Sequence, residues 1–268
     1  MIKISIKFLL YLLILSSCQT GKLDNLTDLP IGLEEVSALE YTAENRLLWI
    51  IEDAGNSSNL YALDAKGQLT TTVEISNSVN DDWEDLAADS SGNIYIGDFG
   101  NNSKKRDEFI IYKISKPKRS TNIITAEKIE FELPKKVESQ DFEAFFLWND
   151  KFYIFSKDDK KGILISVKNQ IGTQEAKLVS EFNLKGKDDA ITSADISEDG
   201  KTVVLLNHEK LWKLTNFKRD DFFGGTVEKM KFDHSSQKEG IVIISKNEVL
   251  ITDERNGSGG GNLYSFKL

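Results

Sequence analysis

Five copies of a short pattern divide this chain into repeats and set the architecture that it can adopt. Each copy is a polar residue, a small residue and a mostly apolar residue: Ser37-Ala38-Leu39, Glu84-Asp85-Leu86, Glu143-Ala144-Phe145, Ser193-Ala194-Asp195 and Glu239-Gly240-Ile241. Successive copies are 47, 59, 50 and 46 residues apart. Periods of ~40 to 50 residues are typical of the four-stranded blades of a β-propeller.

Two more repeated patterns accompany this first one, and we call each of the three a register. Polar residues end an apolar stretch sixteen residues after Ser37 and fourteen residues after the four later copies: Asp53, Asp98, Lys157, Asn207 and Asp253. Strands with bulky residues at alternate positions follow at 60–63, 111–114, 164–167, 211–214 and 263–266. Fourth strands are predicted near 69–75, 128–132, 177–182 and 226–232. No long segment has helical periodicity, so the sequence predicts an all-β propeller.

The fifth repeat has only three predicted strands, because the sequence stops at Leu268. Residues 22–33 precede the first repeat and can supply the missing strand. The two ends of the chain would then meet in one blade and close the ring, which protects strand edges. We therefore expect five blades. The alternative of six would need about 40 more residues at the usual period.

The N-terminal segment indicates export. Lys3 and Lys7 give a positive start, residues 8–15 are apolar, and Leu15-Ser16-Ser17-Cys18 follows. The apolar run is far shorter than the roughly 20 residues that span a bilayer, which favours a signal peptide over a transmembrane helix. The order of these parts resembles that of bacterial lipoproteins, in which the cysteine is acylated and becomes the first residue. An ordinary signal peptide with an incidental cysteine is the alternative, but Cys18 is the only cysteine of the chain.

The expected organisation is a signal peptide over 1–17, a lipidated tether over 18–22 and one propeller domain over 23–268. Gln19 is not the aspartate associated with retention in the inner membrane, so we expect the cell envelope, with the outer membrane favoured. Loss of residues 1–17 removes two of the 34 basic residues and none of the 43 acidic ones, which leaves a net charge of −11. An acidic surface of this kind argues against nucleic acid as a partner.

The first two registers should form two polar rings at one mouth of the central channel, because the innermost strand starts and the next strand ends at the same face. The inner ring would hold Ser37, Glu84, Glu143, Ser193 and Glu239, and the second ring Asp53, Asp98, Lys157, Asn207 and Asp253. Crowded carboxylates must be protonated, paired or bound to a metal. The glutamates have a second interpretation, in which they tie blades together by accepting backbone N–H bonds.

Three second-ring aspartates begin a shared tetrad with asparagine at its fourth position, at Asp53–Asn56, Asp98–Asn101 and Asp253–Asn256. These tetrads lie on neighbouring blades once the ring closes. Asp and Asn oxygens in a turn suit a hard cation such as Ca²⁺. The same residues are also ordinary turn formers, so each tetrad alone fits a structural role.

Other catalytic signals are sparse. The sequence has no Gly-x-Ser-x-Gly motif and no zinc-type spacing of His or Cys. Lys157 is the one fixed positive charge of the two rings, which fits an ion pair or a grip on an anionic ligand. His208 directly follows the second ring and is a secondary candidate for a proton carrier.

Three stretches carry a resemblance to known proteins: Asp82-Trp83-Glu84-Asp85-Leu86-Ala87, Tyr95-Ile96-Gly97-Asp98-Phe99-Gly100-Asn101-Asn102 and Leu250-Ile251-Thr252-Asp253-Glu254. They resemble the SdiA-regulated and related TolB-like or NHL-like propellers of bacterial envelopes. That broad group includes calcium-dependent lactonases and phosphotriesterases with a cation at the channel mouth. The resemblance implies that Glu84, Asp98, Asn101, Glu143 and Asp253 are the positions that could hold Ca²⁺ here. Those enzymes have six blades, whereas this sequence has five repeats.

Two functions remain open on the sequence alone. The favoured one is a non-catalytic envelope protein, anchored through Cys18, whose acidic mouth holds a cation and a small, polymeric or protein ligand. The alternative is a calcium-dependent hydrolase, of the lactonase or phosphoesterase kind, with Glu84 or Glu143 as general base.

Overall fold

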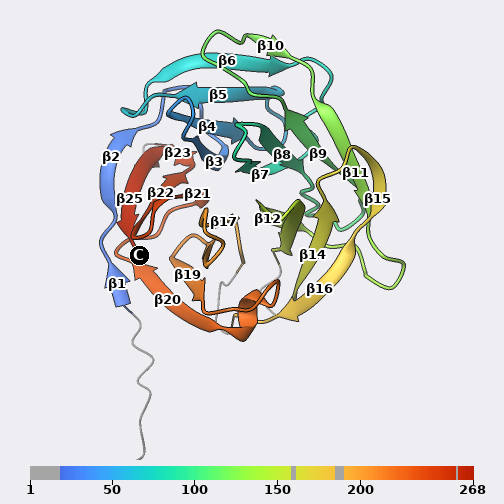
Figure 1. Cartoon of the computed structure of the whole chain (residues 1–268). Coiled ribbons are helices and arrows are strands. Elements are labelled where there is room, and N and C mark those ends of the chain that lie inside the picture. Colours follow the sequence, from blue (N-terminus) through green and yellow to red (C-terminus); the bar gives the residue numbers. More distant parts are fainter. Residues whose placement is uncertain (1–18, 158–160, 185–189, 258) are drawn as a thin grey trace, which may run out of the picture.

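The structure is a computed structural model that describes residues 19–157, 161–184, 190–257 and 259–268. These residues form a β-propeller of five antiparallel sheets arranged around a central axis (Figure 1). The only helix among them is the 3₁₀ turn η1 (Phe222–Gly224). No helix in the described part of the chain is long and apolar enough to cross a membrane. The predicted all-β class and the predicted five blades are confirmed.

The first three blades follow the repeats in sequence order, from the inner strand to the outer one. Blade 1 consists of β3 (Val36–Thr42), β4 (Leu47–Glu52), β5 (Asn59–Leu63) and β6 (Leu69–Ile75). Blade 2 consists of β7 (Trp83–Ala88), β8 (Ile94–Asp98), β9 (Glu108–Ile114) and β11 (Glu127–Glu132). Blade 3 consists of β12 (Phe142–Trp148), β13 (Lys151–Ser156), β14 (Gly162–Lys168) and β16 (Lys177–Phe182).

The last two blades bring the chain ends together. Blade 4 consists of β17 (Ser193–Ile196), β18 (Thr202–Leu206), β19 (Lys210–Thr215) and β20 (Thr226–Phe232). Blade 5 consists of β21 (Lys238–Ser245), β22 (Glu248–Asp253), β25 (Asn262–Lys267) and β2 (Asp24–Asp28). Antiparallel pairing of β2 with β25 closes the ring, as the sequence predicted for residues 22–33.

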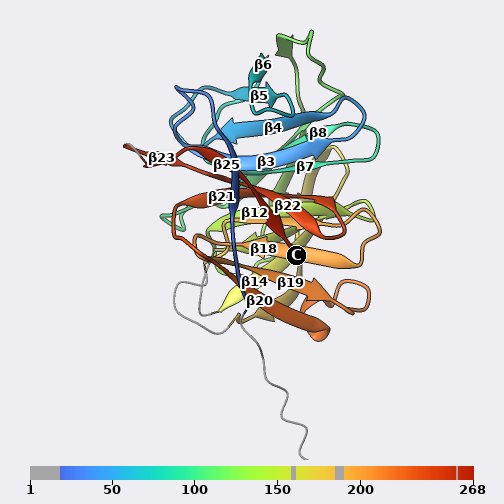
Figure 2. The same cartoon turned by 90° about the vertical axis from the view of Figure 1, so that its left-hand side faces the viewer.

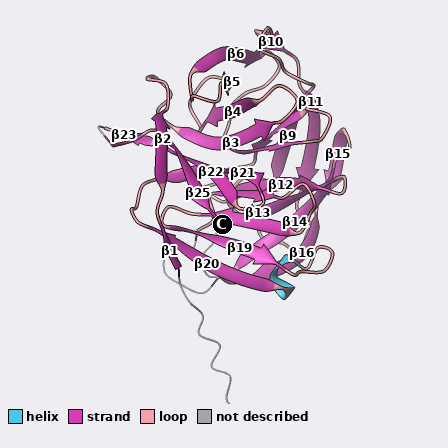
Figure 3. Ribbon diagram, turned by 60° about the vertical axis from the view of Figure 1, so that its left-hand side comes forward, coloured by secondary structure: helices cyan, strands magenta, loops and turns pink. Residues whose placement is uncertain are grey.

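Three blades gain a fifth, outermost strand that the repeat pattern did not predict. β10 (Ile123–Ile124), β15 (Gly172–Glu175) and β1 (Gln19–Gly21) pair in parallel with β6, β11 and β20. On blade 3 the turn η1 lies beside the outer strand (Figure 3), and Phe223 stacks on Phe182 with ring centroids 4.8 Å apart. A short hairpin, β23 (Arg255–Asn256) and β24 (Gly259–Gly260), extends beyond one face of the blades (Figure 2).

The core lies between neighbouring blades, because each sheet presents one face to the next. The largest side chains there are aromatic; between blades 2 and 3, for example, Phe109, Phe142 and Phe145 are fully buried. Burial of such a side chain contributes ~1.5 to 3 kcal/mol each. A chain without an intrachain disulfide can therefore rest on packing alone.

At the waist of the channel, Asp85 on β7 connects neighbouring inner strands through hydrogen bonds. Its carboxylate accepts hydrogen bonds from the N–H groups of Leu86 (3.0 Å), Phe145 (2.9 Å) and Ala194 (3.2 Å) and from Oγ of Ser193 (2.9 Å). Ser193 Oγ in turn accepts the N–H of Ile241 (3.2 Å). This network joins the inner strands of blades 2, 3, 4 and 5.

Candidate functional site

The inner-ring residues point out of the regular ladder because the innermost strands bulge there. The pairing register of the inner strand shifts at Ser37, Glu84, Glu143 and Glu239. A β-bulge leaves one residue unpaired and re-aims its side chain. In four of the five blades, the polar residue of the repeat is therefore the bulged residue, which frees its side chain from the alternation of the strand.

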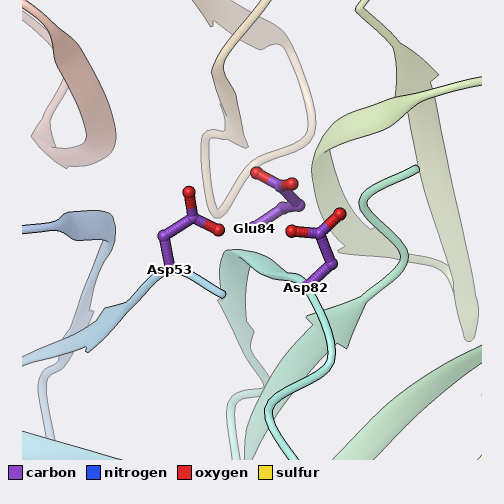
Figure 4. A group of neighbouring side chains, drawn as sticks. All are labelled: Asp53, Asp82 and Glu84. Atoms are coloured by element: carbon purple, nitrogen blue, oxygen red, sulfur yellow. The ribbon is translucent and has the colours of Figure 1, made fainter. Parts of the chain in front are cut away.

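Three carboxylates converge at this mouth. Asp53 follows β4, Asp82 precedes β7 and Glu84 is the bulged residue of β7; one carboxylate oxygen of each lies within 4.8 Å of the others (Figure 4). Asn80 fixes the arrangement, because its amide donates to the carbonyl oxygens of Glu52 and Asp53 (2.9 Å each) and its oxygen accepts the N–H of Trp83 (3.1 Å). We call Asp53, Asp82 and Glu84 the carboxylate cluster.

Glu84 is the member of the carboxylate cluster that accepts no hydrogen bond from the described residues. It is 6% exposed, and within the described residues no donor is in hydrogen-bond contact with its carboxylate. A buried carboxylate without hydrogen-bond donors carries a large desolvation penalty, which the charge of Lys157 offsets only in part. The geometry thus leaves room for a cation as the missing partner.

Gly100 keeps the cluster open. Its N–H donates to the carbonyl oxygen of Asp82 (3.2 Å), which holds the two segments side by side. A Cβ at residue 100 would overlap Oε1 of Glu84 and the carboxyl carbon of Asp82. The backbone of the loop therefore approaches the carboxylates as closely as a glycine allows.

Burial and mutual repulsion disfavour the charged forms of the cluster. Burial, with the charge of Asp53, raises the pKa of Asp82 to about 6. Burial and the neighbouring Glu143 raise the pKa of Glu84 well above its ordinary value. Burial also raises the pKa of Asp53, against a hydrogen bond from the N–H of Ala54. A divalent cation would reverse these shifts by compensating the negative charges.

Two other inner-ring glutamates have basic partners, a lysine and a histidine. Glu143 accepts a hydrogen bond from Nζ of Lys157 at 2.5 Å, and Glu239 lies 2.8 Å from Nε2 of His208. Burial raises the pKa of Glu143 to about 8, although Lys157 acts in the opposite direction. Burial lowers the pKa of Lys157, but Glu143 outweighs it and keeps that pKa above its ordinary value. Ser37 and Ser193, the remaining members of the ring, bond to Trp83 O and Asp85.

Most side chains of the second ring form hydrogen bonds within their own blade and do not point to the cluster. Asp98 is fully buried, lies 2.9 Å from Nη1 of Arg106 and accepts the N–H of Asp82 (3.3 Å). Asp253 accepts hydrogen bonds from Tyr264 Oη (3.0 Å) and Asn262 N (2.8 Å). Asn207 accepts the N–H groups of Glu209 (3.0 Å) and Lys210 (2.9 Å). Only Asp53 of this ring joins the carboxylate cluster.

The three tetrad asparagines make contacts within the loops of the mouth. Asn101 donates to Ser139 Oγ and Gln140 O (2.9 Å each) and accepts the N–H of Lys105 (2.8 Å) and of Arg106 (3.0 Å). Asn56 donates to Glu35 Oε2 (2.8 Å), and Asn256 donates to Gln237 Oε1 (3.5 Å). These bonds fit the turn-forming interpretation of the tetrads.

A shallow pocket of about 380 Å³ opens beside the cluster. Its walls are Asp81, Asp82, Gly100, Asn101, Asn102, Ser103 and Arg106. Asp82 and Gly100 thus belong both to the cluster region and to the pocket. A ligand in the pocket would lie next to a cation held by the cluster.

The sequence pattern places Asp53 and Glu84 at the mouth but does not single out Asp82. Asp82 lies two residues before Glu84, outside the repeated pattern, and enters only as part of the stretch that carries the family resemblance. The spacing of two residues from Glu84 is not by itself a signal, because the bulge at Glu84 breaks the alternation of the strand.

The fold and this mouth define the class of protein as a five-bladed β-propeller with an acidic mouth built from bulged inner strands. The chain belongs to the SdiA-regulated family, whose model matches residues 23–210. No curated protein matches it in sequence.

Among solved structures, the PQQ-bound aldose sugar dehydrogenase of Streptomyces coelicolor is similar, with a TM-score of 0.56, 10% identity and coverage of 92% of this chain and 98% of that chain. A gluconolactonase of Xanthomonas campestris, XC5397, also matches, with a TM-score of 0.49, 10% identity and coverage of 87% and 72%. At these identities the first likeness concerns the fold alone, and the second carries no further weight.

Proposed function

We propose that this chain is an envelope lipoprotein whose propeller binds a calcium ion at the carboxylate cluster and takes a ligand or protein partner at the same mouth. The observation that carries the proposal is Glu84. It is buried, receives no hydrogen bond from the described residues, and faces Asp53 and Asp82 across a space that Gly100 leaves open.

The donor set selects the kind of cation. All three side chains of the cluster are carboxylates, and no His or Cys belongs to it. Oxygen ligands suit hard cations, and Ca²⁺ accepts them in a flexible geometry with 6 to 8 ligands at about 2.3 to 2.6 Å. The protein supplies three side chains on one side, so ligand or water oxygens would complete the coordination from the pocket beside Asp82.

The proposed anchor rests on the lipobox, and the position of β1 would set where it meets the propeller. Cys18 is bonded directly to Gln19, the first residue of β1, which pairs with Met230 on the outer strand of blade 4. A lipid on Cys18 would therefore hold the rim of blades 4 and 5 against the membrane without a flexible spacer. The expected location is the envelope, with the outer membrane favoured over the inner one.

Calcium titration calorimetry tests the cation site. The sample is residues 18–268 with Cys18→Ser, which keeps every described strand. We expect one site in the micromolar to millimolar range, as for other protein calcium sites of moderate affinity. Glu84→Gln should remove it. Glu44→Gln, an exposed residue outside the cluster, is the matched control and should leave the affinity unchanged.

Fractionation tests the anchor. The full chain expressed in a bacterial host should sediment with membranes, and Cys18→Ser should abolish lipidation and release the folded propeller. Mass spectrometry of the N-terminal peptide should show an acylated Cys18 as the first residue. An unmodified mature N-terminus elsewhere would contradict the lipoprotein assignment.

A further inference from the structure

Another pocket lies at the outer strands of blade 3, away from the channel mouth. It has a volume of about 230 Å³, and part of its wall is the loop between β14 and β16, which extends to blade 2 as β15 (right-hand side of Figure 1). Lys151, at the start of β13, forms another part of the wall, whereas Lys157 of the second ring directly follows β13. A strand rises about 3.3 Å per residue, so these two residues are about 20 Å apart. The pocket is therefore distinct from the carboxylate cluster.

Three lysines of this pocket lie on one face of the blade 3 sheet. Lys151 pairs directly opposite Lys168, and Ser166 pairs opposite Lys177. Side chains two residues apart on a strand share a face, so Ser166 and Lys168 bring all four side chains to the same side. Like charges directly opposite each other in a sheet repel, and within the described residues no ion pair joins any of the three lysines to a carboxylate. The pocket thus concentrates positive charge on a chain that is acidic as a whole.

Ser166 supplies a buried hydroxyl among these lysines. Ser166 is 8% exposed and lies in the wall of the pocket. Its Oγ has no hydrogen-bond partner within the described part of the chain. Buried polar groups nearly always have a hydrogen-bond partner, so the hydroxyl calls for an acceptor that enters the pocket. A ligand oxygen held by the lysines would be such an acceptor.

The loop side of the pocket is held in place by Gln174. Its side-chain oxygen accepts the N–H of Lys168 (3.0 Å), and its amide donates to the carbonyl oxygens of Lys168 (3.0 Å) and Gln170 (3.2 Å). Beside it, Thr173 Oγ1 donates to Glu130 Oε2 (3.1 Å) on β11, with which β15 pairs in parallel. The wall is therefore ordered before a ligand arrives, which lowers the entropic cost of binding.

We propose that this pocket binds the phosphate group of a small phosphate monoester. Three lysines and one acidic residue, Glu175, line it, so three positive charges and one negative charge leave a net charge of +2. A phosphate monoester carries a charge of about −1.5 to −2 at pH 7, which this pocket would compensate. Lysine binds phosphate as a point charge, whereas bidentate recognition of a carboxylate uses arginine, and the described residues of the wall include no arginine.

The size of the pocket limits the rest of the ligand. Pockets for drug-sized ligands have volumes of about 300 to 1,000 Å³, and this one has about 230 Å³. It therefore has room for a phosphate and a few carbon atoms. Glycerol 3-phosphate is a ligand of this size, and the phospholipid phosphatidic acid carries the same phosphate monoester of glycerol as its head group. These two compounds are matched probes for a soluble source and a membrane source of the phosphate.

Calorimetry tests the pocket with the soluble probe. The chain of residues 18–268 with Cys18→Ser is titrated with glycerol 3-phosphate in calcium-free buffer, and we expect one site. Lys168→Gln should weaken the affinity at least about tenfold, as expected for the loss of a hydrogen bond to a charged group. Ser166→Ala should weaken it about fivefold, as for a single hydrogen bond. Lys66→Gln removes an exposed lysine from the corresponding turn of blade 1 and should leave the affinity unchanged.

Vesicle sedimentation distinguishes the two sources. Phosphatidylcholine vesicles are prepared with and without phosphatidic acid. If those with phosphatidic acid sediment the parent but not Lys168→Gln, and free glycerol 3-phosphate releases the parent, the pocket binds the lipid head group. If glycerol 3-phosphate binds in solution and the vesicles do not sediment the parent, the pocket binds a soluble ester.

Two further readouts show that the variants fold and where the probe binds. Lys168→Gln removes the repulsion from Lys151, so without ligand its Tm should equal or exceed that of the parent. Glycerol 3-phosphate should shift the backbone amide NMR signals of Ser166 and Gly172, which lie at the pocket, and leave that of Glu84 at the mouth unchanged.

Three results would overturn the phosphate site. They are the absence of glycerol 3-phosphate binding, equal weakening by Lys168→Gln and Lys66→Gln, and amide shifts confined to other blades. The titrations contain no calcium, so failure of the proposed calcium site leaves this inference standing, and failure of the phosphate site leaves the calcium site standing.

Discussion

Glu84 and Asp85 are neighbours in β7, but their carboxylates differ in how many hydrogen-bond donors surround them. Asp85 is fully buried at the waist and accepts four hydrogen bonds, from groups on blades 2, 3 and 4. Glu84 is 6% exposed at the mouth, and no donor of the described chain bonds to it. A buried carboxylate surrounded by donors holds the fold together. A buried carboxylate surrounded by other carboxylates destabilises the fold unless a cation compensates the negative charges.

The bulge in β7 produces this difference. The pairing register shifts between Trp83 and Asp85, so Glu84 leaves the ladder and turns to the mouth. Asp85 resumes the ladder and turns into the channel, where the N–H groups of Phe145 and Ala194 lie. One backbone irregularity therefore separates the structural carboxylate from the one that we propose binds the cation.

The largest expected effect is on the structural side of the comparison. Asp85→Ala leaves three buried N–H groups, of Leu86, Phe145 and Ala194, and the Ser193 hydroxyl without their acceptor. We expect the free energy of unfolding to fall by about 3 to 5 kcal/mol, since each unsatisfied group costs about 1 to 3 kcal/mol. Chemical denaturation measures it. Asp85→Asn retains one acceptor oxygen and should lose less, and equal stability of Asp85→Ala and the parent would contradict the waist network.

The next effect concerns the space beside Glu84. Gly100→Ala should weaken calcium binding by more than about tenfold, or about 1.4 kcal/mol, because the added methyl group occupies the cluster. Calorimetry measures the affinity. Gly259→Ala is the control, since its Cβ would meet only the carbonyl oxygen of Asn256, at 3.8 Å. Unchanged affinity in Gly100→Ala would place the cation elsewhere.

Asp82→Asn should separate stability from binding. Removing one of three repelling carboxylates should raise the Tm of the calcium-free protein by about 2 °C, roughly the effect of 0.5 to 1 kcal/mol in a domain of this size. The same substitution should weaken calcium binding. A fall in both quantities would indicate that Asp82, like Asp85, has a structural role.

The smallest effect is the pH dependence of the calcium-free protein. The pKa values of Asp82 (about 6), Glu254 (about 7) and Glu143 (about 8) are raised in the folded state. The folded state then retains protons that the unfolded state has released, so stability falls as pH rises from about 4 through these values. Thermal unfolding should show this decline, and calcium should offset it most at the alkaline end. A Tm that rises over this pH range would contradict the raised pKa values of these groups in the folded state.

The arrangement of the blades could be predicted because the strand pattern repeats along the sequence. Five copies of the inner strand locate each blade, and residues 22–33 are the segment left over to complete the fifth. The added strands β1, β10 and β15 escape prediction because they are short and pair in parallel with a neighbouring blade, which leaves no local pattern.

The site was predictable only in part because side-chain direction depends on distant partners. Asp98 and Asp253 share the register of Asp53, but Arg106 and Tyr264 draw their carboxylates into their own blades. Asp82 lies outside the register, and the hydrogen bond from Gly100 to its carbonyl oxygen holds it beside the cluster. A repeat shows which strand ends meet at the mouth, and the individual hydrogen bonds decide which of them face one another.

The most direct measurement is a crystal structure of the mature chain grown with calcium, with terbium as an anomalous substitute. We expect one peak between the carboxylates of Asp53, Asp82 and Glu84, with cation–oxygen distances of about 2.3 to 2.6 Å. The same crystals of Glu84→Gln should lack the peak. An empty cluster in the parent, or a peak that survives unchanged in Glu84→Gln, would contradict the proposed cation site.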